Sequence, residues 1–114
     1  MTLLAPLLQG FFSDRLIAQR SVTPHTLSAY RDSFRLLLEF ASKRLKKVPS
    51  DLYLDEIDAT LIGEFLGHLE RSRHNSIRTR NLRLAAIRSF FRYLALREPA
   101  HLGLIQRVLA IGQK

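Results

Sequence analysis

Apolar side chains recur along most of this chain at intervals of three and four residues, the spacing of a helix with one buried face. Sustained alternation of apolar and polar positions is nearly absent, and the chain has no Asn-Gly or Asp-Gly turn to join two strands. The pattern predicts an all-α fold, with a core of four helices and a short fifth helix at the C-terminal end.

Two helices are predicted in the N-terminal half. The first extends from about Leu3 to Arg20, and Pro6 fits only in its first turn. The second begins with Thr23 as N-cap and Pro24 at the first helical position, where its missing N–H costs nothing. Its buried face is predicted to consist of Leu27, Tyr30, Phe34, Leu37, Leu38, Ala41 and Leu45.

Residues 50–57 are predicted to form an acidic connector to the C-terminal half. Asp58, and then Asn75 or Ser76, have side chains that can cap a third and a fourth helix, predicted over residues 59–73 and 77–97. Pro99 opens a short fifth helix with an apolar stripe formed by Leu102, Ile105 and Leu109. A helix of about three turns is too short to be stable without packing, so this stripe must find a surface.

The composition limits the class of protein. A chain of 114 residues that is 46% apolar is sufficient for one domain with a real core. It has no cysteine, which excludes disulfides and zinc-thiolate sites. The chain begins without the basic segment of a signal peptide and has no apolar run long enough for a membrane span, so we expect a soluble, cytoplasmic protein.

Basic and acidic residues are segregated along the chain, whose net charge is +8. The balance is +5 over residues 1–50, −6 over residues 51–70 and +8 over residues 71–97, a stretch of eight arginines without an acid. This segregation predicts a basic face and an acidic face, which is typical of a protein with a polyanionic partner. An ordinary basic surface is the alternative.

The side of the second helix opposite its apolar face carries Ser28, Arg31 and Arg35. Glu39 continues this side, and its carboxylate would repel phosphate, so a DNA-facing surface is expected in the N-terminal half of the helix. That half also presents His25, Thr26 and free backbone N–H groups, which suit a phosphate. A solvated helix face is the alternative for the arginines, and Tyr30 is expected to pack in the core.

One flank of the fourth helix is expected to carry Arg78, Asn81, Ala85, Arg88 and Arg92. Arginine binds phosphates and guanine edges with a planar fork of donors, and no acid on this helix is placed to neutralise the three charges. The flank is therefore predicted to bind a polyanion rather than to serve the fold alone.

Two segments resemble helices of the N-terminal domain of the phage integrase, or tyrosine recombinase, family. Residues 21–40, SVTPHTLSAYRDSFRLLLEF, resemble its T-x-x-x-Y-x-x-x-L helix, with Thr26 and Tyr30 at the threonine and tyrosine positions. Residues 76–94, SIRTRNLRLAAIRSFFRYL, resemble its R-L-S-A-I-R-S-F-F-R-Y-L helix almost letter for letter. The resemblance extends over nearly all of the chain.

The resemblance implies a SAM-like core-binding domain that closes one half of a C-shaped clamp around duplex DNA, with its second and fourth helices near the major groove. The contact candidates that it carries over by position are His25, Thr26, Ser28, Arg35, Arg78, Thr79, Asn81, Arg83 and Arg88. The implied partners are double-stranded DNA and other recombinase subunits during DNA integration and recombination. No cofactor, small-molecule substrate or membrane is expected as a partner.

The resemblance also places catalysis outside this chain. The family cleaves DNA with a tyrosine and stabilises the transition state with basic residues of a separate C-terminal domain. Residues 1–111 are expected to form the DNA-binding domain, and residues 112–114 the start of a linker. His68 and Arg71 match the family's H-x-x-R motif by chance, because they lie mid-helix and far upstream. Glu64 and His68 lack a third metal ligand.

In several members of the family the last helix of this domain docks on a neighbouring subunit. We therefore expect the fifth helix to be a protein–protein element rather than part of the core, docked on its own bundle in this chain and exchanged in the full assembly. Two other functions stay open: a stand-alone helical DNA-binding regulator, and a helical interaction module for an acidic partner or a membrane surface. The salt dependence of DNA binding would separate the module from the recombinase.

Overall fold

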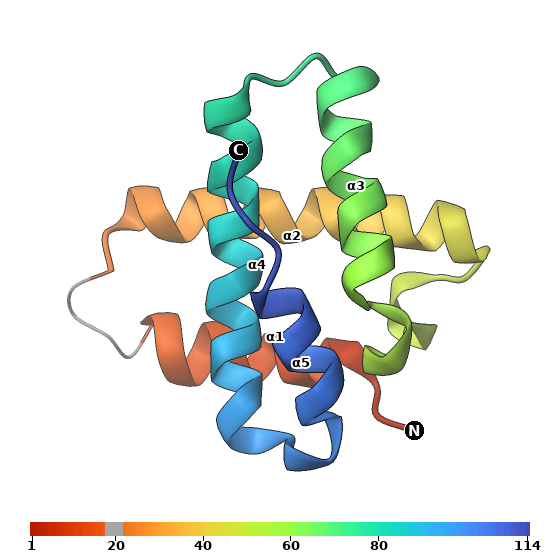
Figure 1. The fold of residues 1–114 in the computed structure, drawn as a ribbon. Helices are drawn as coiled ribbons and strands as arrows, with labels where there is room; N and C mark the ends of the chain where they lie inside the picture. The colour runs from red at the N-terminus through yellow and green to blue at the C-terminus, as the bar shows by residue number, and fades with distance from the viewer. Residues whose placement is uncertain (18–21) are drawn as a thin grey trace.

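Five helices make up the fold in the computed structural model, which describes residues 1–17 and 22–114 (Figure 1). They are α1 (Leu4–Gly10), α2 (Pro24–Leu45), α3 (Ala59–Arg71), α4 (Ile77–Arg97) and α5 (Leu102–Leu109). In Figure 1, α2 crosses α3 and α4, which stand side by side, while α1 crosses the far end of α4 and α5 packs along it. The predicted all-α fold, with a fifth short helix, is confirmed.

The long helices begin where short polar side chains cap them. Thr23 Oγ1 accepts a hydrogen bond from the Thr26 N–H (3.1 Å), and Asp58 Oδ1 accepts one from the Leu61 N–H (2.9 Å). Of the two candidates before α4, the cap is Ser76, whose Oγ accepts from the Thr79 N–H (3.1 Å). Each cap satisfies a backbone donor that has no partner inside its helix.

The prediction of one regular helix from Leu3 to Arg20 is wrong in the described residues. α1 ends at Gly10 and is followed by a π-helical segment, Phe11–Ile17, while residues 18–21 lie outside the described part of the chain. A Cβ atom on Gly10 would lie 2.8 Å from the Tyr93 hydroxyl, so glycine permits the close approach of α1 to α4. The wider turn that follows leaves Phe11 fully buried.

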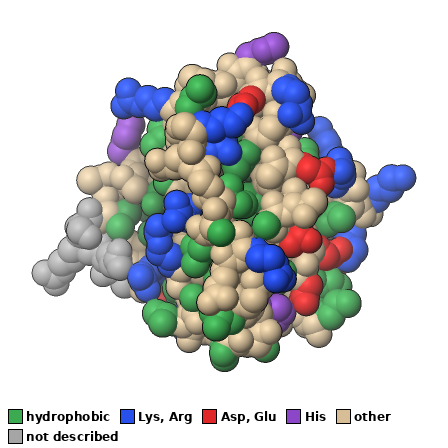
Figure 2. All heavy atoms as spheres, in the orientation of Figure 1, with side chains coloured by type: hydrophobic (Ala, Val, Ile, Leu, Met, Phe, Trp, Pro, Cys, Tyr) green, Lys and Arg blue, Asp and Glu red, His purple; other side chains and the backbone are tan. Residues whose placement is uncertain are grey.

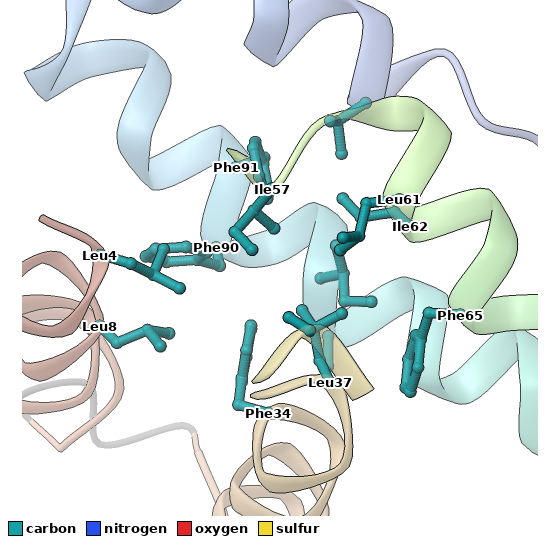
Figure 3. Close-up of a cluster of buried hydrophobic side chains, with 14 of the residues drawn as sticks. Leu4, Leu8, Phe34, Leu37, Ile57, Leu61, Ile62, Phe65, Phe90 and Phe91 are labelled. Atoms are coloured by element: carbon teal, nitrogen blue, oxygen red, sulfur yellow. The ribbon is translucent and has the colours of Figure 1, made fainter. Parts of the chain in front are cut away.

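The core lies where all of these elements meet. Figure 3 shows Phe34 and Leu37 of α2 facing the same interior as Phe90 and Phe91 of α4. Phe11 is central to the cluster: its ring centroid lies 6.1 Å from that of Phe34 and 5.4 Å from that of Phe90. The predicted core face of α4 is buried throughout: Leu84, Ile87, Phe90, Phe91 and Leu94.

Residues 50–57 are more than an acidic connector. Two 3-10 turns, Pro49–Asp51 and Leu54–Glu56, place Leu52 and Leu54 in the core without exposed surface. The N-terminus runs beside this segment, with hydrogen bonds from the Leu4 N–H to the Leu52 carbonyl (2.9 Å) and from the Leu54 N–H to the Thr2 carbonyl (2.8 Å). The acidic residues on either side of these leucines, Asp51, Asp55 and Glu56, are exposed or partly exposed, and their charge made the segment look like a solvated connector.

The expectation that the fifth helix lies outside the core is also wrong. A 3-10 turn, Pro99–His101, precedes α5, and Ile105 and Val108 have no exposed surface. The helix docks on its own bundle against α4 and α3, as expected for this chain.

In the described part of the chain, no helix combines the length and apolar character needed to cross a bilayer.

Candidate nucleic-acid interface

The N-terminal halves of α2 and α4 enclose an open groove of about 620 Å³, here called the α2–α4 groove. It is lined by His25, Thr26, Ala29, Tyr30, Asp32 and Ser33 from α2 and by Thr79, Leu82, Arg83 and Ala85 from α4. Four residues of the predicted DNA contact set are therefore brought together here: His25, Thr26, Thr79 and Arg83. Tyr30 is half-buried and its ring stacks against Phe11 at 6.5 Å, so its predicted place in the core is confirmed.

Arg83 fixes the two walls of the α2–α4 groove to each other. Its Nη1 donates to Ser33 Oγ (3.1 Å) and to the Ala29 carbonyl (3.4 Å). Ser33 is buried and donates to the same carbonyl (2.9 Å), so the polar contact between the helices is a small network. The partners of Arg83 are neutral, and the positive charge of the guanidinium is left uncompensated at the groove wall.

Both helix N-termini open onto the α2–α4 groove. Thr26 and Thr79 stand in the first turn of α2 and of α4, and each helix directs the positive end of its dipole to this region. The caps use one N–H of each helix, the Thr26 N–H and the Thr79 N–H. Donors of the first turns that have no intrahelical partner suit a phosphate oxygen.

The outer flank of α4 carries arginines that no acid neutralises. Arg78 and Arg92 are exposed and Arg88 is partly exposed. Among residues 1–17 and 22–114, no carboxylate lies within 4.0 Å of the guanidinium nitrogen atoms of these three residues. The absence of counter-charge, which the sequence predicted within the helix, therefore extends to the contacts between elements.

The other predicted residues of α2 face away from the groove. Arg31 and Arg35 line a separate hollow between α2 and the N-terminal segment, beside Leu8 and Phe12. Arg35 is also neutralised: its Nη1 lies 3.2 Å from Glu39 Oε1, and its Nη2 lies 4.0 Å from Asp32 Oδ1. Ser28 is exposed and lines neither hollow. These three residues are therefore not brought together with the α4 arginines.

Arg80 was not singled out from the sequence, and it is the most buried arginine of α4. Its side chain is 9% exposed; Nε lies 3.3 Å from Glu70 Oε1 on α3, and Nη1 donates to the Gly112 carbonyl (3.2 Å). Nη1 also donates to Asn81 Oδ1 (3.0 Å), and the Asn81 side chain bonds to the backbone of Lys114 (3.1 and 3.2 Å). Asn81 thus holds the C-terminal segment, and its amide is already engaged.

The acidic residues 51–70 meet bases from other elements instead of forming a separate acidic face. Arg44 pairs with Glu64. Lys47 Nζ lies 3.0 Å from Glu56 Oε2, and Glu70 accepts a hydrogen bond from Lys114 Nζ (2.8 Å). Figure 2 shows acidic side chains gathered on the right of the view, next to basic ones. The predicted segregation along the sequence is therefore partly cancelled in space on this side of the bundle.

Two of these carboxylates have depressed pKa values. The Tyr53 N–H, which donates to Glu56 Oε1 (2.9 Å), is the main cause of the lowered pKa of Glu56, and Lys47 adds to it. The hydrogen bond from Lys114 is the main cause of the lowered pKa of Glu70, with smaller contributions from Arg80 and Arg71. Both groups favour their charged forms because donors of the fold stabilise them.

His68 and Arg71, the residues of the apparent H-x-x-R motif, do not line the α2–α4 groove. His68 packs its ring on Phe40 at 5.2 Å between centroids, and the guanidinium of Arg71 lies against Gly67. In the described residues there is no group of three or more histidine or carboxylate side chains placed to hold a metal ion.

Comparison with known proteins gives one family and two relatives. Residues 9–98 match the family described as "Phage integrase, N-terminal SAM-like domain". The chain is 59% identical over 111 residues to y4rC and 54% identical over 112 residues to y4rD, two Sinorhizobium fredii proteins provisionally named integrase/recombinase. These matches cover 97% and 98% of the chain but only 33% and 40% of the relatives. No solved structure matches the chain.

Proposed function

The chain belongs to the phage integrase N-terminal SAM-like domain family, and we propose that it is the DNA-binding part of a site-specific tyrosine recombinase. In this proposal it binds duplex DNA at the recombination site, forming one half of a clamp during integration and recombination. The surface is the α2–α4 groove together with the outer flank of α4. The strand-cleaving residues, including the tyrosine nucleophile, belong to sequence outside these 114 residues, since the relatives are two to three times as long.

The observation that carries the proposal is the uncompensated charge around a preformed groove. Arg78, Arg88 and Arg92 have no acidic partner in the described structure, although the same chain pairs Arg44 and Lys47 with glutamates. Unpaired arginines spaced along one rigid helix, whose first turn opens onto the groove, are suited to a row of phosphates. Contacts to phosphate position a protein on the duplex, so the isolated domain is expected to bind with little sequence preference.

Partners beyond DNA follow from the same proposal. Tyrosine recombinases work as assemblies on paired sites, so other subunits of the enzyme are the expected protein partners. Because α5 is part of the core in this chain, an exchange of α5 between subunits would have to break the contacts of Ile105 and Val108 with the bundle. The exchange of α5 is therefore proposed only for the full assembly, and the test has to be made on that assembly.

The proposal is tested by mapping the surface that meets DNA. Amide chemical shifts of the isotope-labelled chain are followed while a short duplex is added at low salt. Changes concentrated in the first half of α2 and along α4, in the ranges 24–33 and 77–92, are expected.

Polyglutamate serves as the control ligand, because an interaction module for acidic partners would respond to it at the same residues. Changes confined to α3 and α5, or an equal response to polyglutamate, would contradict the proposal.

A further inference from the structure

The α2–α4 groove contains apolar surface that electrostatic binding of phosphate does not need. Leu82 is 61% exposed although it stands in the first half of a basic helix, and Ala29 and Ala85 line the same groove. A second hollow of about 390 Å³ lies on the other side of Leu82 and Ala85 and is also lined by Ile77, which is 56% exposed. Leu82 and Ala85 therefore form an apolar ridge between two hollows.

The ridge is held in place rather than free to collapse. Arg83, next to Leu82 in the sequence, ties α4 to the Ala29 carbonyl and to Ser33 on α2. Single exposed apolar residues are ordinary on protein surfaces. Here, however, three apolar side chains from two helices line one fixed groove whose other walls carry His25 and Arg83.

The charges around the ridge indicate what covers it. The one carboxylate that lines the α2–α4 groove, Asp32, lies 4.0 Å from the Arg35 guanidinium, while Arg78 stands at the second hollow without an acidic partner in the described chain. A ligand with small apolar groups between anionic ones fits this pattern. Duplex DNA offers that arrangement in its major groove, where the thymine C5-methyl group lies between two rows of phosphates.

We infer that Ala29, Leu82 and Ala85 contact thymine methyl groups in the major groove and give the domain a preference for thymine-containing sites. This inference rests on the proposed function, because it requires the α2–α4 groove to face DNA. The major groove of B-DNA is about 12 Å wide and admits an α-helix, whereas the major groove of A-form RNA is too narrow for side chains to read. The preference should therefore be specific for DNA that carries the methyl group.

Replacement of thymine by uracil in one duplex removes the methyl groups and leaves every base pair and phosphate in place. Binding of the chain to the two duplexes is measured by fluorescence anisotropy at the same low salt. The uracil duplex is expected to bind roughly threefold to tenfold more weakly, the loss expected for one or two buried methyl contacts. In the Leu82→Gln variant, which loses the largest of the three apolar contacts, the difference between the two duplexes should be clearly smaller.

The matched control is Leu96→Gln, which changes a leucine on the same helix that is 80% exposed and lies outside both hollows. This variant should keep the full difference between thymine and uracil. Equal binding of the original protein to both duplexes, or an unchanged difference in Leu82→Gln, would overturn the inference while the proposed function stands. Failure to bind either duplex at low salt would instead overturn the proposed function.

Discussion

The contacts of α2 with α3 and with α4 treat basic side chains in different ways. Toward α3 and the preceding connector, Arg44 of α2 pairs with Glu64, and Lys47, just after α2, pairs with Glu56. Toward α4, the arginine that reaches α2 is Arg83, and it bonds to a serine hydroxyl and a carbonyl instead of an acid. On the α3 side two basic residues are thus neutralised within the fold, while the arginine on the α4 side bonds only to neutral groups, as the proposed DNA surface requires.

The difference shows that net charge alone does not locate a polyanion site. The end of α2 and the residues that follow it, 43–47, are rich in lysine and arginine, yet Arg44 and Lys47 are paired with glutamates. Surface ion pairs contribute little to stability, about 1 kcal/mol or less each, so their main consequence is to remove charge from the surface. On α4, by contrast, Arg78, Arg88 and Arg92 have no acidic partner in the described part of the chain.

Removal of the α4 charges should have the largest effect on binding. The variant Arg78→Gln, Arg88→Gln, Arg92→Gln is expected to bind duplex DNA roughly 100-fold more weakly, since three phosphate contacts are lost, and its salt dependence should be correspondingly shallower. Helicity by circular dichroism should be unchanged. The measurement is a DNA titration by fluorescence anisotropy.

A charge-matched variant is the control for that loss. Lys43→Gln, Lys46→Gln, Arg107→Gln removes the same net charge from three exposed positions away from the α2–α4 groove. It should lose only a few-fold in affinity, through the weaker long-range field. If both triple variants lose the same affinity, net charge rather than the α4 surface governs binding, and the comparison fails.

Arg80 sharpens the comparison because it is an α4 arginine that does have an acidic partner. Arg80→Ala removes its contacts with Glu70 and the Gly112 carbonyl, and should cost about 2 kcal/mol of stability. In a domain of this size that corresponds to a melting temperature lower by roughly 8 °C. Below its melting temperature the variant should bind DNA nearly as well as the original chain. A large loss of affinity with unchanged stability would mean that Arg80 faces the ligand.

A variant of Glu56 tests how much this carboxylate contributes to the stability of the α3 side. Its depressed pKa means that the charged form is stabilised in the folded state, so this contribution is present above the ordinary carboxyl pKa of 4.5 and is lost as the pH falls below it. Glu56→Gln should lower stability near neutral pH by about 1 kcal/mol. As the pH falls through the lowered pKa of Glu56, the two proteins should converge in thermal melts. A constant difference at all pH values would show that Glu56 acts through packing alone.

The smallest expected effect concerns Asp32, the one acid among the described residues that lines the α2–α4 groove. Asp32→Asn removes a repulsion of phosphate and frees Arg35 from one of its two partners, so DNA affinity should rise about twofold to threefold. Glu64→Gln removes an acid on the α3 side and is the control, since it should leave affinity unchanged. Weaker binding by Asp32→Asn would indicate that Asp32 accepts a hydrogen bond from a base.

Local signals made much of this structure predictable. Thr23, Asp58 and Ser76 cap helices because a short side chain can accept from a backbone donor within its own segment. The buried face of α4 follows from its apolar spacing. In contrast, the need for glycine at position 10 comes from the Tyr93 hydroxyl, and the N-terminus bonds to the segment that contains Leu52, so neither feature could be predicted from its own surroundings.

The candidate site was also predictable only in part, because local patterns reveal some of its residues while contacts between distant segments determine the others. The unpaired arginines of α4 follow from the absence of acids near them in sequence. Arg31 and Arg35 are on the polar side of α2, but helical spacing does not say which neighbour that side meets, and it meets the segment that contains Phe12. The bonds from Arg83 to Ser33 and from Arg80 to Gly112 join residues 50 and 32 positions apart and leave no pattern in the sequence.

The salt dependence of duplex binding by the unaltered chain tests the central claim most directly. If the α4 arginines and the two helix N-termini meet phosphates, the logarithm of the affinity should fall linearly with the logarithm of salt concentration, with a slope of about −4 for four to five phosphates. Binding should be detectable at low salt and weak near physiological ionic strength. A slope near zero, or no binding at low salt, would contradict the claim that this surface holds DNA.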